Sequence, residues 1–330
     1  AASNFHLKVE SDSLRYKSMQ FSNLNLDQWL EKETIRAMYT IERFNYSDSL
    51  HFDDIHFNTN GGNNKLDHIL TWHEKSVDEI SKISWDSHIK DADHYGFMLN
   101  PSYFYIQGHK WDISHASNVE FQSDTVRVDN FELIRNNQKV LIDGQVSSHP
   151  KDKLQFEVQN LELAELSPFL TTEYPMSGII NLDANISDPF NNFGYEGDGS
   201  LTKFFVKNQK VGDLTINSEW DVLKKGIKTS GNLFYAEEKT FDFDGYYYLF
   251  EEEDNLDFNL NFDLTNLQFT NAFMDPDVVS EIRGYLDGKL HLTGTPSLPI
   301  LAGDIALRSG SAYIDLLGVH FGVDGPIDVD

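Results

Sequence analysis

The chain has 330 residues with 26 basic and 53 acidic side chains, so its formal net charge is −27, and it contains no cysteine. The acidic balance argues against nucleic acid as a partner, because a phosphate backbone needs Lys and Arg to neutralise it. It also disfavours docking of a basic patch on anionic lipid headgroups. Without cysteine, a disulfide scaffold, a thiolate metal site and a cysteine nucleophile are excluded.

Residues 1–115 combine short apolar runs with the best helix candidate of the chain. The stretch 26–38 offers Asp27 as a cap and acidic residues in the first turns, which predicts a short helix. The apolar residues from Ile35 to Ile41 fit a helix or a strand equally well. Farther on, Gly61-Gly-Asn-Asn64 is typical of a turn.

Residues 116–280 read as a series of short strands. Apolar side chains recur at every second position, which gives each run one apolar and one polar face. Strand signals follow one another every 10 to 15 residues, an all-β pattern. Only 165–173 and 270–282 suggest short helical or irregular crossovers. The alternating pairs and series are Val126/Val128, Val140/Ile142, Phe156/Val158, Ile180/Leu182/Ala184/Ile186, Leu214/Ile216, Phe241/Phe243 and Leu256/Phe258/Leu260/Phe262/Leu264.

A short phrase, apolar-x-Asn-apolar-x-apolar, recurs along the chain. Before the Asn, apolar residues are two positions apart, but the step across the Asn is three. In a regular strand this step would place the following apolar residues on the opposite face. A bulge or bend accommodates such a step, and Asn tolerates the left-handed conformation that a bend can need. We therefore expect strands to bend at these positions, with coincidence in an Asn-rich sequence as the alternative. The phrases centre on Asn23, Asn118, Asn130, Asn160 and Asn266.

A longer similarity links two parts of the chain at an offset of roughly 100 residues. The stretch from Asp143 to Leu163 resembles that from Asp244 to Phe269, and the segment that begins at Gly178 resembles the one that begins at Gly284. Such repetition suggests repeated units that bury their apolar faces by stacking on one another.

The last part, residues 281–330, contains three short alternating runs separated by glycine and proline. Leu286, Leu290 and Leu292 share one parity, Ile305 and Leu307 form a second run, and residues 313–317 form a third. We expect the Gly-Thr-Pro break at 294–296 to be the place where the chain leaves one rung of the stack and enters the next. The strand-like alternation still continues at the final residues, which suggests a piece of a longer protein.

Motifs that would indicate catalysis or metal binding are not found in the sequence. His88, His94, His109 and His115 form a loose group whose spacing fits no zinc signature. The stretch that begins at Asp91 starts like a calcium loop but lacks the glutamate at its twelfth position. No nucleophile elbow, phosphate-binding glycine loop or HExxH motif occurs. We expect no enzymatic activity, no metal and no cofactor.

The C-terminal motifs resemble a known family. The string Gly284-Tyr-Leu-Asp-Gly-Lys-Leu-His-Leu-Thr-Gly-Thr-Pro-Ser-Leu-Pro299-Ile-Leu-Ala-Gly303, followed by Ile314-Asp-Leu-Leu-Gly318-Val-His-Phe321, is similar to the C-terminal translocation/assembly module signature of the TamB family. This family belongs to the AsmA-like, bridge-like lipid-transport group. Upstream stretches around Trp111, Val126 and Ile142 look like repeats of its Bacteroidota versions. The resemblance is clearest from about residue 100 onward.

This resemblance implies an elongated sheet of many short strands, curled into a U-shaped apolar groove called a β-taco. It divides the chain into an AsmA/TamB-like β-repeat region (1–115), β-groove repeats (116–280) and the start of the C-terminal signature domain (281–330). It also implies a place in the periplasm of a Gram-negative bacterium, bridging the inner and outer membranes. An inner-membrane anchor that this chain lacks and an Omp85-type (BamA-like) outer-membrane barrel would be its partners.

The expected function is transport of phospholipids along the groove, with their acyl chains held against its apolar lining. A scaffold or chaperone for outer-membrane protein assembly, acting with the barrel, is the first alternative. A structural solenoid or adhesin with a closed, dry core is the second. The lining is expected from the apolar parity of the clearest strands: Ile180, Leu182, Ile186, Leu256, Phe258, Leu260, Phe262, Leu264, Leu286, Leu290, Leu292, Ile305 and Leu307.

Overall fold

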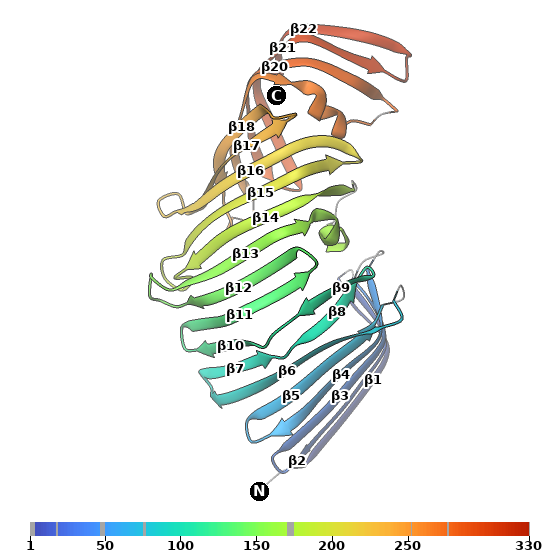
Figure 1. Ribbon diagram of the computed structural model, residues 1–330, viewed down its shortest axis with the longest axis vertical. Coiled ribbons are helices and arrows are strands. Elements are labelled where there is room, and N and C mark those ends of the chain that lie inside the picture. The colour runs from blue at the N-terminus through green and yellow to red at the C-terminus, as the bar shows by residue number, and fades with distance from the viewer. Residues whose placement is uncertain are drawn as a thin grey trace. The chain divides into compact units, whose positions relative to one another are not determined.

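The computed structural model describes residues 4–17, 19–46, 50–74, 77–169, 175–251, 253–275 and 277–329. These residues form 22 strands of one antiparallel sheet and two short 3-10 helices, η1 (Leu163–Phe169) and η2 (Leu267–Ala272) (Figure 1). The all-β prediction is confirmed. The chain divides into two compact units: unit 1 comprises residues 1–159, 168–171 and 187–191, and unit 2 comprises 160–167, 172–186 and 192–330.

Unit 1 is a meander with one inserted hairpin. Successive strands pair with each other except at β7, whose partners are β6 and β10. The β8–β9 hairpin between them contacts the ends of the longer strands β6 and β11 through the pairs Lys82–Tyr103 and Ile134–Asp112. The strands are β1 (Phe5–Tyr16), β2 (Met19–Glu31), β3 (Thr34–Asn45), β4 (His51–Gly62), β5 (Lys65–His73), β6 (Ile80–Asp91), β7 (His94–Leu99), β8 (Ser102–Ile106), β9 (His109–Ile113), β10 (Ser117–Gln122), β11 (Thr125–Arg135), β12 (Gln138–Val146) and β13 (Lys153–Glu162).

The densest core of unit 1 surrounds this inserted hairpin. Tyr105, Trp111 and Ile113 of the hairpin are buried, as is Trp72 of β5. The Oγ of Ser81, which has no exposed surface, accepts a hydrogen bond from the Tyr105 amide at 3.0 Å. The hairpin therefore fills what would otherwise be a gap between β6 and β11.

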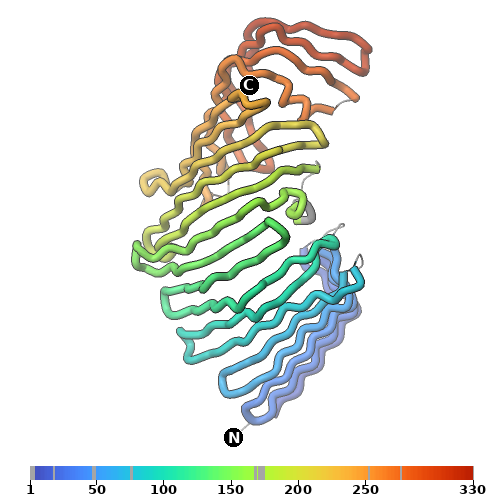
Figure 2. The backbone as a smooth tube through the Cα atoms, viewed as in Figure 1, coloured from blue at the N-terminus to red at the C-terminus, as the bar shows by residue number. Residues whose placement is uncertain are grey.

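Unit 2 is a plain meander in which tight turns join most neighbouring strands (Figure 2). From β15 onward each strand pairs with the next in antiparallel register. Its strands are β14 (Met176–Ser187), β15 (Gly194–Val206), β16 (Gln209–Asp221), β17 (Gly226–Tyr235), β18 (Glu238–Tyr247), β19 (Leu256–Asn266), β20 (Val279–Thr295), β21 (Leu298–Ile314) and β22 (Val319–Val329).

The helix expected over 26–38 is wrong. Strands β2 and β3 occupy this stretch and are joined by a tight turn in which Lys32 has a positive φ of 56°. Pairing of Leu30 with Ile35 and of Leu26 with Tyr39 places apolar side chains together on one face. Burial of that shared face outweighs the local capping signal, because helix propensity is a weak preference.

The Asn phrases mark real bends at three of five positions. Asn23, Asn130 and Asn160 adopt positive φ values of 48°, 51° and 51°, and the β11–β12 register shifts at Asn130. Asn118 lies in regular register. Asn266 instead caps η2 by accepting a hydrogen bond from the Gln268 amide, and the bulge lies just before it, at Leu264.

The long repeat has the same order of elements in both copies. The first contains β12, β13, η1, β14 and β15, and the second β18, β19, η2, β20 and β21. The break at 294–296 is the hairpin turn that joins β20 to β21, the next strand of the stack. Ile305, Leu307 and Tyr313 lie in one strand, β21, rather than in two.

Candidate functional site: the apolar face of the sheet

Unit 2 presents an apolar face built from rows of cross-strand neighbours. Side chains on one face of a sheet meet directly opposite partners on the next strand, so the register defines each row. One row crosses β15 to β22 as Leu201, Leu214, Leu233, Phe241, Phe262, Gly288, Ile305 and Ile327. The next row is Gly199, Ile216, Gly231, Phe243, Leu260, Leu290, Gly303 and Val329.

Aromatic rings lie over glycines within these rows. A Cβ added to Gly231 would come within 2.4 Å of Thr215 O and 2.5 Å of the Phe243 ring. One added to Gly245, in the adjoining row, would come within 2.1 Å of Asp257 O and 2.8 Å of Phe258 Cδ1. The glycines therefore provide the space into which the neighbouring rings lie back. The ring of a neighbouring strand thus occupies the space that the glycine leaves free, and the surface of the face is more even as a result.

The apolar face is only half-buried. Leu260, Phe262, Leu290, Ile305 and Leu307 all have intermediate exposure. The chain exposes 19809 Å² in total. Two separate compact domains, each of half its 37.8 kDa mass, would together expose about 16,700 Å². The exposed surface of the chain exceeds that of two compact domains. A single-layer sheet whose faces are not covered by another layer accounts for this excess.

One end of the unit 2 face is closed by η2. Phe269 and Ala272 of this short helix form a buried cluster with Val206, Val211 and Leu233. The Phe269 ring lies 5.9 Å from that of Phe241, a member of the first row. The helix thus covers the first row at β17 and β18, whereas Leu260 and Leu290 of the second row stay half-exposed.

Unit 1 carries an equivalent face with a more aromatic lining. Its central row is Val9, Leu26, Tyr39, Phe57, Leu70 and Ile83. Phe21, Phe44 and Phe52 stack on successive strands, with ring centroids 4.6 and 6.2 Å apart. This part of the face is apolar and presents flat rings beside its branched aliphatic groups.

A polar trio interrupts the unit 1 face. His68 lies in register between Thr59 and Trp85, and its ring stacks 4.9 Å from that of Trp85. The imidazole Nδ1 and Nε2 are within hydrogen-bonding distance of Thr59 Oγ1 (2.9 Å) and Ser87 Oγ (2.7 Å). Burial lowers the pKa of His68, although the nearby carboxylates of Asp67 and Asp86 act to raise it.

The structure brings most of the expected lining residues of β19 to β21 onto one face. Phe258 pairs with Leu292, and Leu260 pairs with Leu290. Leu286 is buried opposite Leu307. Leu182 of β14 belongs to the same face, because its Cδ1 would lie 3.7 Å from a Cβ added to Gly199, a member of the second row. Ile180 and Ile186 lie at even spacing from Leu182 on the same strand. Leu256 lies opposite Tyr247 at the start of β19.

Leu264 lies outside this face. It adopts φ of 45° at the bulge of β19 and is 54% exposed. Beyond the bulge Thr265 pairs with Leu286, so Thr265 takes the place that strict alternation gives to Leu264. Leu201, Leu233 and Ile327 also belong to this face but were not predicted. Their strands β15, β17 and β22 contain too few alternating apolar residues for the pattern to be recognised in the sequence.

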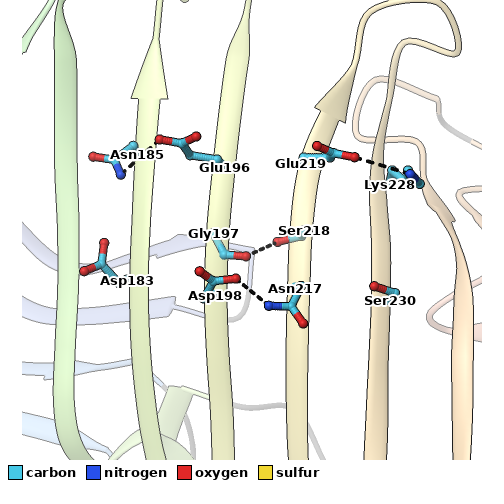
Figure 3. A pocket seen from close by; sticks show the side chains of 10 residues that line it. All are labelled: Asp183, Asn185, Glu196, Gly197, Asp198, Asn217, Ser218, Glu219, Lys228 and Ser230. Atoms are coloured by element: carbon cyan, nitrogen blue, oxygen red, sulfur yellow. Dashed lines mark hydrogen bonds and ion pairs between the residues drawn. The ribbon is translucent and has the colours of Figure 1, made fainter.

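The opposite face of unit 2 is polar. A shallow hollow across β14 to β17 is lined by Asp183, Asn185, Glu196, Gly197, Asp198, Asn217, Ser218, Glu219, Lys228 and Ser230 (Figure 3). These side chains pair across strands, as Asn217 Nδ2 does with Asp198 Oδ1 at 2.6 Å. The carboxylates are thus part of a ladder of polar contacts on the solvated side of the sheet.

The grouped histidines are only partly brought together. Nε2 of His88 and of His94 lie 3.2 and 3.5 Å from Glu120 Oε2 on the polar face of unit 1. Burial raises the pKa of Glu120, but hydrogen bonds from Asn118 and His88 outweigh it and leave the pKa lowered. His115 instead contacts Asn130 O at 2.9 Å. Within the described ranges, no group of three His, Cys, Asp or Glu is placed to hold a metal ion.

Fold and face together define a class of protein: antiparallel β-sheets of a single layer, each with a long apolar face open to solvent. The comparison with protein families is specific. A model described as the N-terminal domain of TamB matches residues 1–307, so the chain belongs to the TamB family. This family comprises transport and assembly modules of the cell envelope that act with outer-membrane partners.

The match covers the first 100 residues, where the motifs are weakest, and also reaches the motifs near Gly284. No curated protein and no solved structure matches the chain. Among the described residues, no helix is long and apolar enough to cross a membrane. The division at residues 116 and 281 remains a prediction.

Proposed function

We propose that the apolar faces carry phospholipid acyl chains between the inner and outer membranes through the periplasm. The observation that supports this is the pair of rows of Leu, Ile, Phe and Gly that cross β15 to β22, whose residues Leu260, Leu290 and Ile305 are half-buried and have no second sheet packed on them among the described elements. The inner-membrane end would use an anchor, and the outer-membrane end an Omp85-type barrel.

The physical basis is transfer of hydrocarbon out of water. Each methylene of an acyl chain that lies against the face is stabilised by about 0.8 kcal/mol. Rows of Leu, Ile and Phe levelled by glycine give similar contacts at successive strands, so a chain would move along the face without meeting a deep minimum. Movement of lipid in this way needs no covalent step.

A scaffold for outer-membrane proteins is the second candidate. Within the described ranges β1 pairs only with β2, and β22 only with β21, so each offers unpaired backbone groups to an incoming strand. A closed, dry solenoid is disfavoured, because the lining side chains retain intermediate exposure.

The proposal can be tested by site-specific photo-crosslinking in cells. A photoreactive amino acid at Leu260 or Leu290, in the full-length protein, is expected to capture phospholipid that mass spectrometry identifies. Asn259 and Asn261 are matched controls on the same strand, since their side chains face the polar side and contact His291 and Asp242. Capture confined to these two positions would refute lipid carriage by the apolar face.

Capture of nascent outer-membrane proteins in place of lipid would favour the scaffold. Ile327 distinguishes lipid carriage from strand pairing. It lies on β22, with which an added strand would pair, and its side chain belongs to the apolar row. Lipid captured at both Ile327 and Leu260 supports a continuous path. Protein captured only along β22 supports edge pairing.

A further inference from the structure

The turns at one edge of unit 2 carry exposed apolar side chains. Because the strands alternate in direction, the turns that follow β16, β18 and β20 lie at the same edge. We call their residues the tip cluster. Its members, with exposed fractions, are Val222 (69%), Leu223 (95%), Leu249 (44%), Phe250 (70%), Leu298 (76%) and Ile300 (58%).

The turns at the opposite edge differ. After β15 the turn contains Lys207 and Asn208, and after β17 it contains Ala236 and Glu237. The connections after β19 and β21 are apolar, with Phe273, Val278, Leu316 and Leu317 exposed. Within the described part of unit 2, the edge with the tip cluster therefore exposes apolar side chains at all three turns, whereas the opposite edge has polar turns after β15 and β17.

The tip cluster is held in place by local contacts. Asp221 Oδ1 accepts hydrogen bonds from the amides of Leu223 and Lys224 at 2.8 and 3.0 Å, which fixes the turn that presents Leu223. Behind it, the rings of Phe193, Trp220 and Phe250 meet edge to face at 4.9 to 6.3 Å. A leucine presented by a fixed turn loses little conformational freedom when it is buried.

The spacing of the turns indicates what kind of surface could cover them. Turns two strands apart are separated by about 10 Å, and polar residues lie between the apolar side chains. A stable protein interface buries about 800 Å² of continuous surface on each partner. Separate projecting side chains instead suit insertion into a fluid interface, where aromatic rings such as Trp220 are favoured.

The charges on the same turns narrow the choice of surface. Lys224 and Lys225 flank Leu223, whereas Glu251, Glu253 and Asp254 follow Phe250. A zwitterionic phospholipid surface offers both phosphate and ammonium groups, which complement charges of both signs. A strongly anionic surface would be repelled by a chain of net charge −27.

We propose that the tip cluster docks on the surface of a zwitterionic phospholipid bilayer, with Leu223 and Phe250 inserted among the acyl chains. Trp220 belongs to the edge of the apolar face, where it pairs with Ile227, so docking would place that face next to the bilayer. The proposal does not depend on lipid carriage by the face, because docking and carriage are measured separately.

The chain contains no cysteine, so a single Leu223→Cys variant can carry one environment-sensitive fluorophore. With phosphatidylcholine vesicles, we expect a blue shift and quenching by nitroxide groups on the acyl chains. A fluorophore on Leu316→Cys, an exposed leucine in a turn at the other edge, is the matched control and should show neither. A Leu223→Glu/Phe250→Glu variant should lose at least about tenfold in vesicle partitioning.

Both substituted side chains are largely exposed, so circular dichroism should show an unchanged fold. If glutamate at 250 disturbs the aromatic contacts, Leu223→Glu alone preserves the test. The proposal is overturned if the label at 223 is unaffected by vesicles or responds no more than the label at 316. It is also overturned if sedimentation shows a dimer that Leu223→Glu dissociates, which would assign the tip cluster to self-association.

Discussion

The apolar faces of the two units show how the same alternation can give different linings. In unit 2 the rows contain aliphatic side chains, glycine and phenylalanine, and rings such as Phe243 lie over glycines. In unit 1 the rings stack on one another across neighbouring strands, and His68 brings a titratable group into the face. Alternation thus fixes which side is apolar, while the individual residues decide how uniform and how pH-sensitive the lining is.

The units also differ in how their buried parts are made. In unit 1 the inserted β8–β9 hairpin contributes the buried residues Tyr105, Trp111 and Ile113, whereas in unit 2 the helix η2 packs on the sheet. Away from these two places, the faces are half-exposed. This contrast separates residues that stabilise the fold from residues that are available to a ligand.

Truncation of a core side chain should have the largest effect. Trp111→Ala in unit 1 is expected to cost about 3–5 kcal/mol and Leu233→Ala in unit 2 about 2–5 kcal/mol, because these residues are 5% and 4% exposed. Leu290→Ala on the open face should cost only about 1 kcal/mol. Denaturant unfolding of the three variants measures these differences. Equal losses for Leu233→Ala and Leu290→Ala would show that the face is a closed core.

Filling the space beneath a ring should have an intermediate effect. A methyl group on Gly231 would lie 2.4 Å from Thr215 O and 2.5 Å from the Phe243 ring, so Gly231→Ala should cost about 1–3 kcal/mol. Gly199 belongs to the same row but its nearest neighbours lie at 3.6 Å or more, so Gly199→Ala is the matched control and should be neutral or slightly stabilising. Thermal unfolding compares them. A tolerated Gly231→Ala would mean that both the Phe243 ring and the neighbouring backbone move readily.

The sequence was sufficient for the fold class and for predicting which side of several strands is apolar. Strict alternation in β19 and β20 predicted Leu260 and Leu290 on one side, and the register confirms that they are neighbours. It failed at Leu264, because a bulge depends on the backbone conformation of a single residue rather than on the pattern. It failed again over 26–38, where cross-strand burial outweighs local helix signals. The tip cluster was not foreseen, since which turns share an edge follows only from the complete strand order.

The smallest effect concerns the pH dependence of unit 1. Burial lowers the pKa of folded His68 below its usual value, so the unfolded chain takes up this proton at a higher pH than the folded chain. Stability is therefore fully retained above about pH 6.5 and falls as the pH drops through that value towards the folded pKa. The loss should be small, because the His68 side chain keeps part of its contact with solvent.

His68→Phe removes the titrating group while keeping a ring beside Trp85, so its stability should fall less than that of the wild type between pH 7.5 and 5.5. Denaturant unfolding at both pH values gives the difference. If His68→Phe keeps the full pH dependence, the imidazole is solvated as freely as in the unfolded chain. The contrast between a titratable unit 1 face and a purely apolar unit 2 face would then not hold.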